Sequence, residues 1–138
     1  MFIADAVKDT ALQYLKDNCV ELVVLDADPG TSYADATTNN GTGSGKRLAT
    51  KALSSTDFTI ADGAAGGRKV TLDDAGTLLV DIAIVANGDA SHVSWLSGSD
   101  VLYTTELATV RTGLTTADTV DIPSHFYAIR DAVEATGN

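Results

Sequence analysis

The sequence is poor in the side chains that hold metal sites and disulfides together, because its 138 residues include only one cysteine and two histidines. One cysteine excludes an internal disulfide. A structural zinc site takes about four nitrogen or sulfur ligands, and the three residues present, Cys19, His92 and His125, are far apart along the chain. We therefore expect no zinc site and no cofactor. Cys19, between a predicted helix and an apolar strand, is expected to be a plain buried cysteine.

Positive charge and long apolar runs are also scarce. Nine lysines and arginines stand against 19 aspartates and glutamates, giving a net charge of −10, so DNA or RNA would be repelled. The longest apolar run, 20–25, contains Glu21 and is far shorter than the roughly 20 residues that span a bilayer. Asp5 and Asp9 stand where a signal peptide would be basic and then apolar. The sequence predicts no nucleic-acid partner, no membrane span and no secretion signal.

The composition favours β structure with many turns. There are 16 aspartates against three glutamates, and 18 threonines. Aspartate favours turns and helix caps, whereas threonine favours strands. The chain is long enough for one hydrophobic core and leaves little room for a second. We therefore predict a single domain, 1–138, of the mainly β class: an antiparallel β-sandwich or jelly-roll-like domain with one N-terminal amphipathic helix.

The helix is predicted within residues 1–18. Between residues 3 and 17, apolar side chains recur on one helical stripe, and the charged residues fall largely elsewhere. The stripe consists of Ile3, Val7, Ala11, Tyr14 and Leu15. We expect this stripe to pack on the domain's own sheet, with docking on a partner as the alternative.

Short apolar or alternating segments separated by turn sequences predict the strands. A first strand is expected at 20–25. The main β region, 48–138, contains eight more segments, at 48–53, 58–60, 68–72, 78–85, 92–96, 101–107, 119–122 and 126–131. The turn signals at 62–67, 87–89 and 97–100 are rich in Gly, Asn and Asp, which favours antiparallel hairpins.

The clearest of these hairpins covers residues 92–107. Alternation places Val93 and Trp95 on one face, packed across the turn against Leu102 or its neighbours. We therefore interpret Trp95 and Tyr103 as core residues rather than as an interface. In the preceding segment the same alternation predicts a buried face that consists of Val80, Ile82 and Ile84.

Residues 31–47 are predicted to form a long exposed loop, because they are rich in Gly, Asn, Ser and Thr and lack large apolar side chains. The sequence GTGSGKR within it is similar to a phosphate-binding loop, but Asn40 and Arg47 stand where that motif needs a glycine and a hydroxyl residue. We expect the loop to contact a partner instead. The candidate contact residues are Thr31, Tyr33, Asn39, Asn40, Lys46 and Arg47.

The plentiful aspartates do not match a calcium motif. Asp26 and Asp28 begin like an EF-hand loop, but Gly30 and Thr31 do not fit its spacing. An irregular calcium site is left open, although solvated turn carboxylates are commoner. Its candidate ligands are Asp26, Asp28, Asp73 and Asp74.

The two histidines are interpreted as strand-end or partly exposed residues. A small hydrolase or lyase would need His92 or His125 within hydrogen-bond reach of a carboxylate or hydroxyl in a pocket. Nothing in the sequence brings such groups together. We therefore predict no catalytic residues and no enzyme activity.

The order of the segments carries a resemblance. The helical sequence FIADAVKDTALQYL is followed by the strand CVELVVLDADPG, a middle rich in Gly, Thr and Ala, and the closing phrase TADTVDIPSHFYAIRDA. In this order, over nearly the whole chain, the sequence resembles small virion structural proteins of tailed bacteriophages. No active-site residues carry over from that resemblance.

The resemblance implies a role in the particle, in the first place as a capsid decoration or cement protein. It implies a place on the outer surface of the virion, with the major capsid protein or other virion proteins as partners, and many copies that form a homo-oligomer. An acidic exterior suits this place, because it stays off the packaged DNA.

Two other functions are left open. The first is a connector or ring component of the neck or tail. The second is an Ig-like surface- or carbohydrate-binding module, which would show exposed aromatic side chains beside an Asp-rich turn. Tyr33 is the aromatic residue most evidently in a loop.

Overall fold

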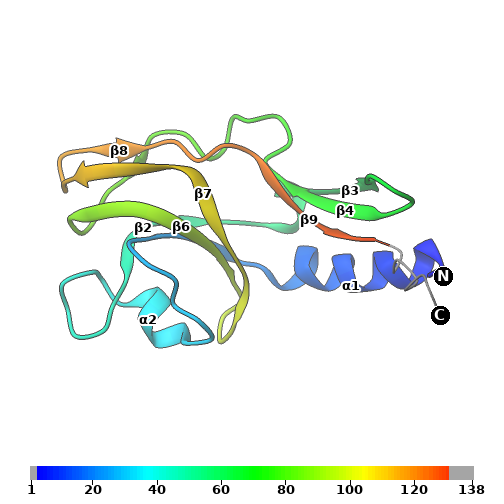
Figure 1. Cartoon of the computed structure of the whole chain (residues 1–138), viewed down its shortest axis with the longest axis horizontal. Helices are drawn as coiled ribbons and strands as arrows, with labels where there is room; N and C mark the ends of the chain where they lie inside the picture. The colour runs from blue at the N-terminus through cyan, green and yellow to red at the C-terminus, as the bar shows by residue number, and fades with distance from the viewer. Residues whose placement is uncertain (1–2, 131–138) are drawn as a thin grey trace, which may run out of the picture.

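A computed structural model of the chain describes residues 3–130. The protein is mainly β, with antiparallel sheets in a sandwich-like arrangement and one N-terminal helix, as predicted (Figure 1). In chain order the elements are α1 (Asp5–Asn18), β1 (Glu21–Leu25), α2 (Tyr33–Thr37), β2 (Arg47–Ala52), the 3-10 turn η1 (Ser55–Asp57), β3 (Phe58–Asp62), β4 (Arg68–Leu72), β5 (Ile82–Ala83), β6 (Gly88–Leu96), β7 (Val101–Leu114), β8 (Thr119–Val120) and β9 (His125–Ile129).

The largest sheet has the order β2-β1-β6-β7 and contains the predicted hairpin. β6 and β7 are joined by a tight turn in which the Ser97 N–H donates to the Asp100 carbonyl at 3.0 Å. Trp95 lies opposite Tyr103 across the pair, so the predicted packing across this turn is confirmed. β7 extends to Leu114, well beyond the predicted end at residue 107.

A second sheet has the order β3-β4-β9. Its β3–β4 hairpin closes at the glycines predicted to form a turn, where the Gly63 N–H donates to the Gly67 carbonyl at 2.9 Å. A Cβ at Gly67 would lie 2.7 Å from the Ile129 carbonyl oxygen. Glycine at this position therefore lets β9 approach the turn.

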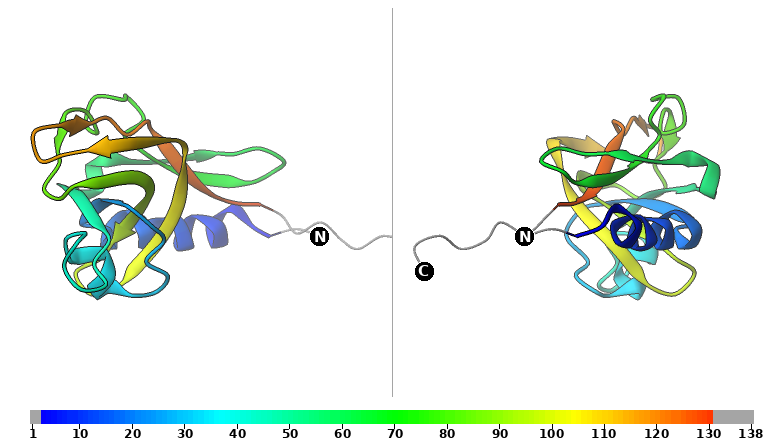
Figure 2. Two further views of the ribbon diagram at one scale, coloured as in Figure 1. Left: turned by 60° about the vertical axis from the view of Figure 1, so that its left-hand side comes forward. Right: turned by 90° about the vertical axis from the view of Figure 1, so that its right-hand side faces the viewer.

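α1 packs beside the β3–β4 hairpin, as Figure 2 shows, but only part of the predicted stripe faces the domain. Leu12 is fully buried and Lys8 is only 2% exposed, and Leu15 packs against the core from a partly buried position. The prediction that the helix packs on the domain's own sheet is confirmed, but the predicted face is wrong at three of its five positions. The members of the predicted stripe that face solvent are Val7, Ala11 and Tyr14.

Polar contacts across the helix–sheet boundary explain this orientation. The Lys8 ammonium donates to the Gly66 carbonyl at 2.8 Å, so its aliphatic stem can be buried while its charge is satisfied. The Arg68 guanidinium on β4 contacts the carboxylates of Asp9 at 2.7 Å and Asp62 at 2.6 Å. Hydrogen bonds to these two carboxylates raise the pKa of Arg68. These contacts hold the Lys8 face against the sheet.

The predicted strand at 78–85 is mostly irregular, and only β5 pairs, with β8. Ile82 and Ile84 are buried as predicted, but Val80 is 43% exposed, so that part of the prediction is wrong. Asp81 adopts a φ of +53°, which interrupts the extended backbone between Val80 and Ile82. Strand alternation therefore does not reach Val80.

Asp73 organises the loop before β5. It is 5% exposed, and its carboxylate accepts backbone N–H groups from Thr77, Leu78 and Leu79, each at 3.0 Å. Its own φ is +56°, a conformation that aspartate tolerates better than most residues. One side chain thus takes the place of the ladder hydrogen bonds that a strand would supply.

The core is centred on Trp95, which is fully buried. Its ring makes edge contacts with Phe58 at 5.3 Å and with Tyr103 at 5.0 Å between ring centroids. Cys19 is 2% exposed, as predicted, and burial raises the pKa of its thiol to about 11. The thiol is therefore protonated and unreactive at neutral pH.

Candidate functional site

The segment 31–47, predicted to be an exposed loop, is instead folded and tied to the sheet. Ser32 caps the short helix α2 by accepting the Asp35 N–H at 3.1 Å, and Ala36 is fully buried. Residues 38 and 47 then lie side by side, because the Arg47 N–H donates to the Thr38 carbonyl at 3.0 Å. The prediction of a long open loop is therefore wrong. Asx and Ser/Thr side chains build local structure here without large apolar residues.

The predicted contact residues divide between the inside and the outside of this segment. Tyr33 is half-buried against the smaller apolar cluster that contains Val23 and Leu25. The Arg47 guanidinium donates to the Asn39 side-chain oxygen at 2.9 Å. These contacts are structural. Thr31 is exposed, and Asn40 and Lys46 are half-buried.

Asn40 anchors the segment to the start of β6. Its side-chain amide donates to the Asn87 carbonyl at 2.9 Å, and the Asp26 carboxylate accepts the Asp89 N–H at 2.8 Å nearby. Residues 87–89, which were predicted to close a hairpin, instead lie at the start of β6. Their Asn87 carbonyl accepts the hydrogen bond from Asn40. The longest run of exposed residues in the segment is its tip, residues 41–44.

Gly45 is the position where this fold of the segment is most sensitive to a side chain. A Cβ there would lie 2.5 Å from both the Thr38 and the Asn39 carbonyl oxygens. We expect Gly45→Ala to lower the free energy of unfolding by about 2 kcal/mol, because backbone atoms must move apart. Urea unfolding of the purified protein measures the change.

Gly98→Ala is the matched control for that experiment. A Cβ at Gly98 meets nothing within 4 Å, so this variant should be as stable as the parent, or more stable by about 0.5 kcal/mol. Equal stability of the Gly45 and Gly98 variants would contradict the close backbone approach at Gly45.

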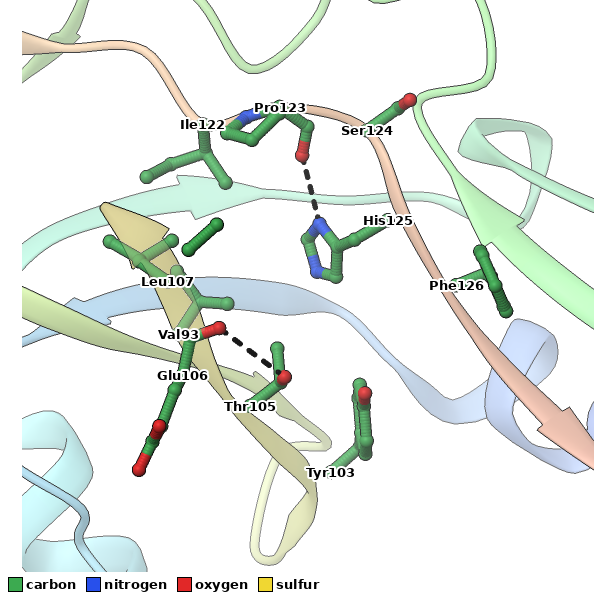
Figure 3. A pocket seen from close by; sticks show the side chains of 11 residues that line it. Val93, Tyr103, Thr105, Glu106, Leu107, Ile122, Pro123, Ser124, His125 and Phe126 are labelled. Atoms are coloured by element: carbon green, nitrogen blue, oxygen red, sulfur yellow. Dashed lines mark hydrogen bonds between the residues drawn. The ribbon is translucent and has the colours of Figure 1, made fainter. Parts of the chain in front are cut away.

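A groove lies between β7 and the segment that leads into β9 (Figure 3). It consists of two adjoining cavities of about 300 Å³ and about 200 Å³. We call it the β7–β9 groove. The larger cavity is lined by Val93, Tyr103, Thr105, Glu106, Leu107, Ala108, Ile122, Pro123, Ser124, His125 and Phe126. The smaller is lined by Leu107, Ala108, Thr109, Arg111, Asp121 and Pro123.

His125 lines this groove, but both of its ring nitrogens are engaged. Nε2 lies 2.8 Å from the Trp95 Nε1–H, which donates to it. Nδ1 lies 3.0 Å from the Pro123 carbonyl, so it carries the proton and donates. Burial lowers the pKa of His125, against the opposing effect of the Pro123 carbonyl. The ring is therefore neutral at pH 7, and neither nitrogen is available to take a proton from a substrate.

His92 lies within reach of a hydroxyl and a carboxylate, yet it does not form a nucleophile and base. Ser91 Oγ donates to the Asp26 carbonyl at 2.8 Å, so its contact with His92 Nδ1 at 2.7 Å must use the histidine as donor. The Glu106 carboxylate lies 3.8 Å from Nε2 on an 84% exposed side chain. A general base must accept the hydroxyl proton, and this arrangement has the opposite polarity.

The four aspartates considered for calcium do not converge on one site. In residues 3–130, no group of three or more His, Cys, Asp or Glu side chains is arranged to hold a metal ion. The Asp73 carboxylate accepts backbone N–H groups, and that of Asp28 accepts the N–H of Gly30 at 2.8 Å. These are turn-forming roles.

None of the helices in residues 3–130 has the length and the apolar stretch that crossing a membrane requires.

Comparison with models of known protein families, with curated proteins and with solved structures gives no match for this chain. The β7–β9 groove and the tip at 41–44 therefore stand as the candidate sites on their geometry alone. Sequence reasoning did not predict the groove. The one signal that bears on it is the strand-favouring Thr and Val in TVRTGL, which continue the strand past position 107.

Proposed function

We propose that the protein is a structural component of a tailed-phage virion, and that it decorates or cements the outer surface of the head through non-covalent contacts. The observation that carries the proposal is its exposed apolar surface. Large apolar side chains that are at least 43% exposed lie on α1, on β7 and on β9, among them Val7, Val110 and Phe126. Where such side chains lie on one face, as Val7 and Tyr14 do two turns apart on α1, they favour contact with partners.

The electrostatics support an exterior place in the particle. A net charge of −10 opposes contact with packaged DNA and keeps the unattached chain soluble. Many symmetric copies would bind through avidity, so that each single contact can be weak. The proposal gives the chain no catalytic step, in keeping with the engaged nitrogens of His125.

A carbohydrate-binding module is a weaker reading of the same surface. Phe126 is 48% exposed and Tyr127 is 37% exposed, but they are neighbours on one strand and point to opposite faces. The Lys69 ammonium lies 5.0 Å from the centre of the Phe126 ring. The Tyr127 ring contacts Tyr103 edge-on, with 5.2 Å between the ring centroids. With Lys69 over Phe126 and Tyr103 against Tyr127, the two rings do not form an open flat platform for a sugar, so the virion role is preferred.

Cryo-electron microscopy of particles from the phage that encodes the chain tests the proposal. We expect density for this fold at repeated positions on the outside of the head, and removal of the gene should give particles that release their DNA at a lower temperature. A single ring at the neck or tail would move the protein to the connector function. Its absence from purified particles would refute a virion role.

A further inference from the structure

The β7–β9 groove is bordered by two strands that each end a sheet. β7 is the last strand of the order β2-β1-β6-β7, and β9 is the last of β3-β4-β9. In the described part of the chain, no strand pairs with the outer side of either one. We propose that this groove binds an extended, basic-ended segment of a partner protein by β-strand addition. This inference does not depend on the virion role.

The shape of the groove fits an extended chain better than a compact ligand. Its two cavities share Leu107, Ala108 and Pro123, so they run end to end along β7 from Tyr103 to Arg111. At about 3.3 Å per residue, that stretch matches a strand of eight or nine residues. The larger cavity, about 300 Å³, is at the lower limit of pockets that take whole small molecules. It suits one or two side chains.

The outer edge of β7 pairs with no strand in residues 3–130, and its ladder with β6 on the inner side is also irregular at this place. His92 pairs with Glu106 and Ala90 pairs with Arg111. Between these two pairs the chain advances five residues along β7 but only two along β6. The residues between Glu106 and Arg111 therefore depart from the regular hydrogen-bond ladder with β6. Edge strands with unpaired N–H and C=O groups accept added strands. Val110, in this stretch, is 48% exposed and offers an apolar contact beside them.

The charge of the groove decides the kind of segment. Glu106 is the only charged residue that lines the larger cavity, and its side chain is 84% exposed. In the smaller cavity Arg111 and Asp121 offset each other. The whole chain carries −10, so a second copy would bring like charge to the groove. A segment with lysine or arginine at its ends is the complementary occupant.

The probe is a synthetic eight-residue peptide of alternating valine and threonine with lysine at both ends. Amide hydrogen exchange followed by NMR should show at least about tenfold protection, at about 1 mM peptide, of the N–H groups in residues 103–111 that point away from β6, because these form new main-chain hydrogen bonds. The same peptide with glutamate ends should bind more weakly. Exchange that is unchanged at residues 103–111 would overturn the proposal.

Two variants separate the groove from other surfaces. Ala108 is exposed and borders both cavities, so Ala108→Arg should weaken peptide binding about tenfold or more, as a bulky cation blocks the middle of the groove. Ala34→Arg is the matched control, at an exposed alanine on α2, and should change binding less than about twofold. Equal loss in the two variants would contradict the location.

Glu106→Lys tests the charge without filling the groove. It should weaken binding of the lysine-ended peptide by about threefold and strengthen that of the glutamate-ended one, as expected for an exposed ion pair. Light scattering of the free protein provides the last check. Dimers that Ala108→Arg dissociates would identify a second copy as the occupant and would overturn the basic partner segment.

Discussion

Replacing Asp73 with alanine should lower the free energy of unfolding by about 4 kcal/mol, because three backbone N–H groups lose a charged acceptor. The carboxylate accepts from Thr77, Leu78 and Leu79, each at 3.0 Å. Asp73 itself is 5% exposed, so water cannot easily replace it. Alanine at a φ of +56° adds backbone strain. Chemical denaturation followed by circular dichroism measures the loss.

The same carboxylate makes stability depend on acid pH. Burial alone would raise the pKa of Asp73, but the backbone hydrogen bonds outweigh it and hold the pKa below its ordinary value of 3.8. The ionised form is thus favoured in the folded state. Its contribution is fully present above the unfolded pKa and is lost as the pH falls through the folded pKa. The parent should therefore lose more stability between about pH 4 and pH 2 than Asp73→Ala does.

Asp74→Ala is the matched control for the Asp73 variant. Asp74 is the next residue and is exposed, so its loss should change stability by less than about 0.5 kcal/mol. Asp73→Asn keeps the residue shape but offers one acceptor atom in place of two, and should cost about 2 kcal/mol. If Asp73→Ala were as stable as Asp74→Ala, the buried carboxylate would not be what holds the loop.

Hairpins and strands were predictable where local chemistry decides the structure. Alternation across the Ser97–Asp100 turn placed Trp95 in the core opposite Tyr103, and the glycines at 63 and 67 marked the β3–β4 turn. In both places two strands are close in sequence, and the turn fixes their register. The mainly β class followed from the same signals.

The helix face could not be predicted because a distant backbone atom decides it. Val7 and Tyr14 look like core residues in the sequence, but they are 62% and 58% exposed. Lys8 is buried instead, since the Gly66 carbonyl, 58 positions away, accepts its ammonium group. Ranking residues by polarity gives no account of such a partner.

The candidate sites were hidden for a related reason. The segment 31–47 is folded by single polar contacts such as Asn40 to the Asn87 carbonyl, which composition does not reveal. The β7–β9 groove exists because β7 and β9 end different sheets. Which strands form the edges depends on the topology of the whole chain, and hydrophobic periodicity reports only on each strand alone.

A loss as large as that of Asp73→Ala should come from Trp95→Ala, about 4 kcal/mol, because this substitution empties the centre of the core. The ring is fully buried and contacts Phe58 and Tyr103 edge-on. Trp95→Phe keeps an aromatic ring but removes the Nε1–H that donates to His125 at 2.8 Å. It should cost about 2 kcal/mol, for the lost bond and the smaller ring. Thermal and urea unfolding measure both variants.

The bond between Trp95 and His125 also makes stability depend on mildly acid pH. Burial lowers the pKa of His125 below its ordinary value of 6.5, so the folded state favours the neutral ring. This contribution is fully present above pH 6.5 and is lost as the pH falls through the folded pKa, when a proton on Nε2 displaces the indole N–H. The parent should therefore become less stable between about pH 6.5 and pH 5.

Two histidine variants test this assignment. His125→Ala should lack the decline in stability, and His92→Ala should keep it. A decline that persists in His125→Ala would assign the pH dependence to another group and leave the indole contact without an energetic role.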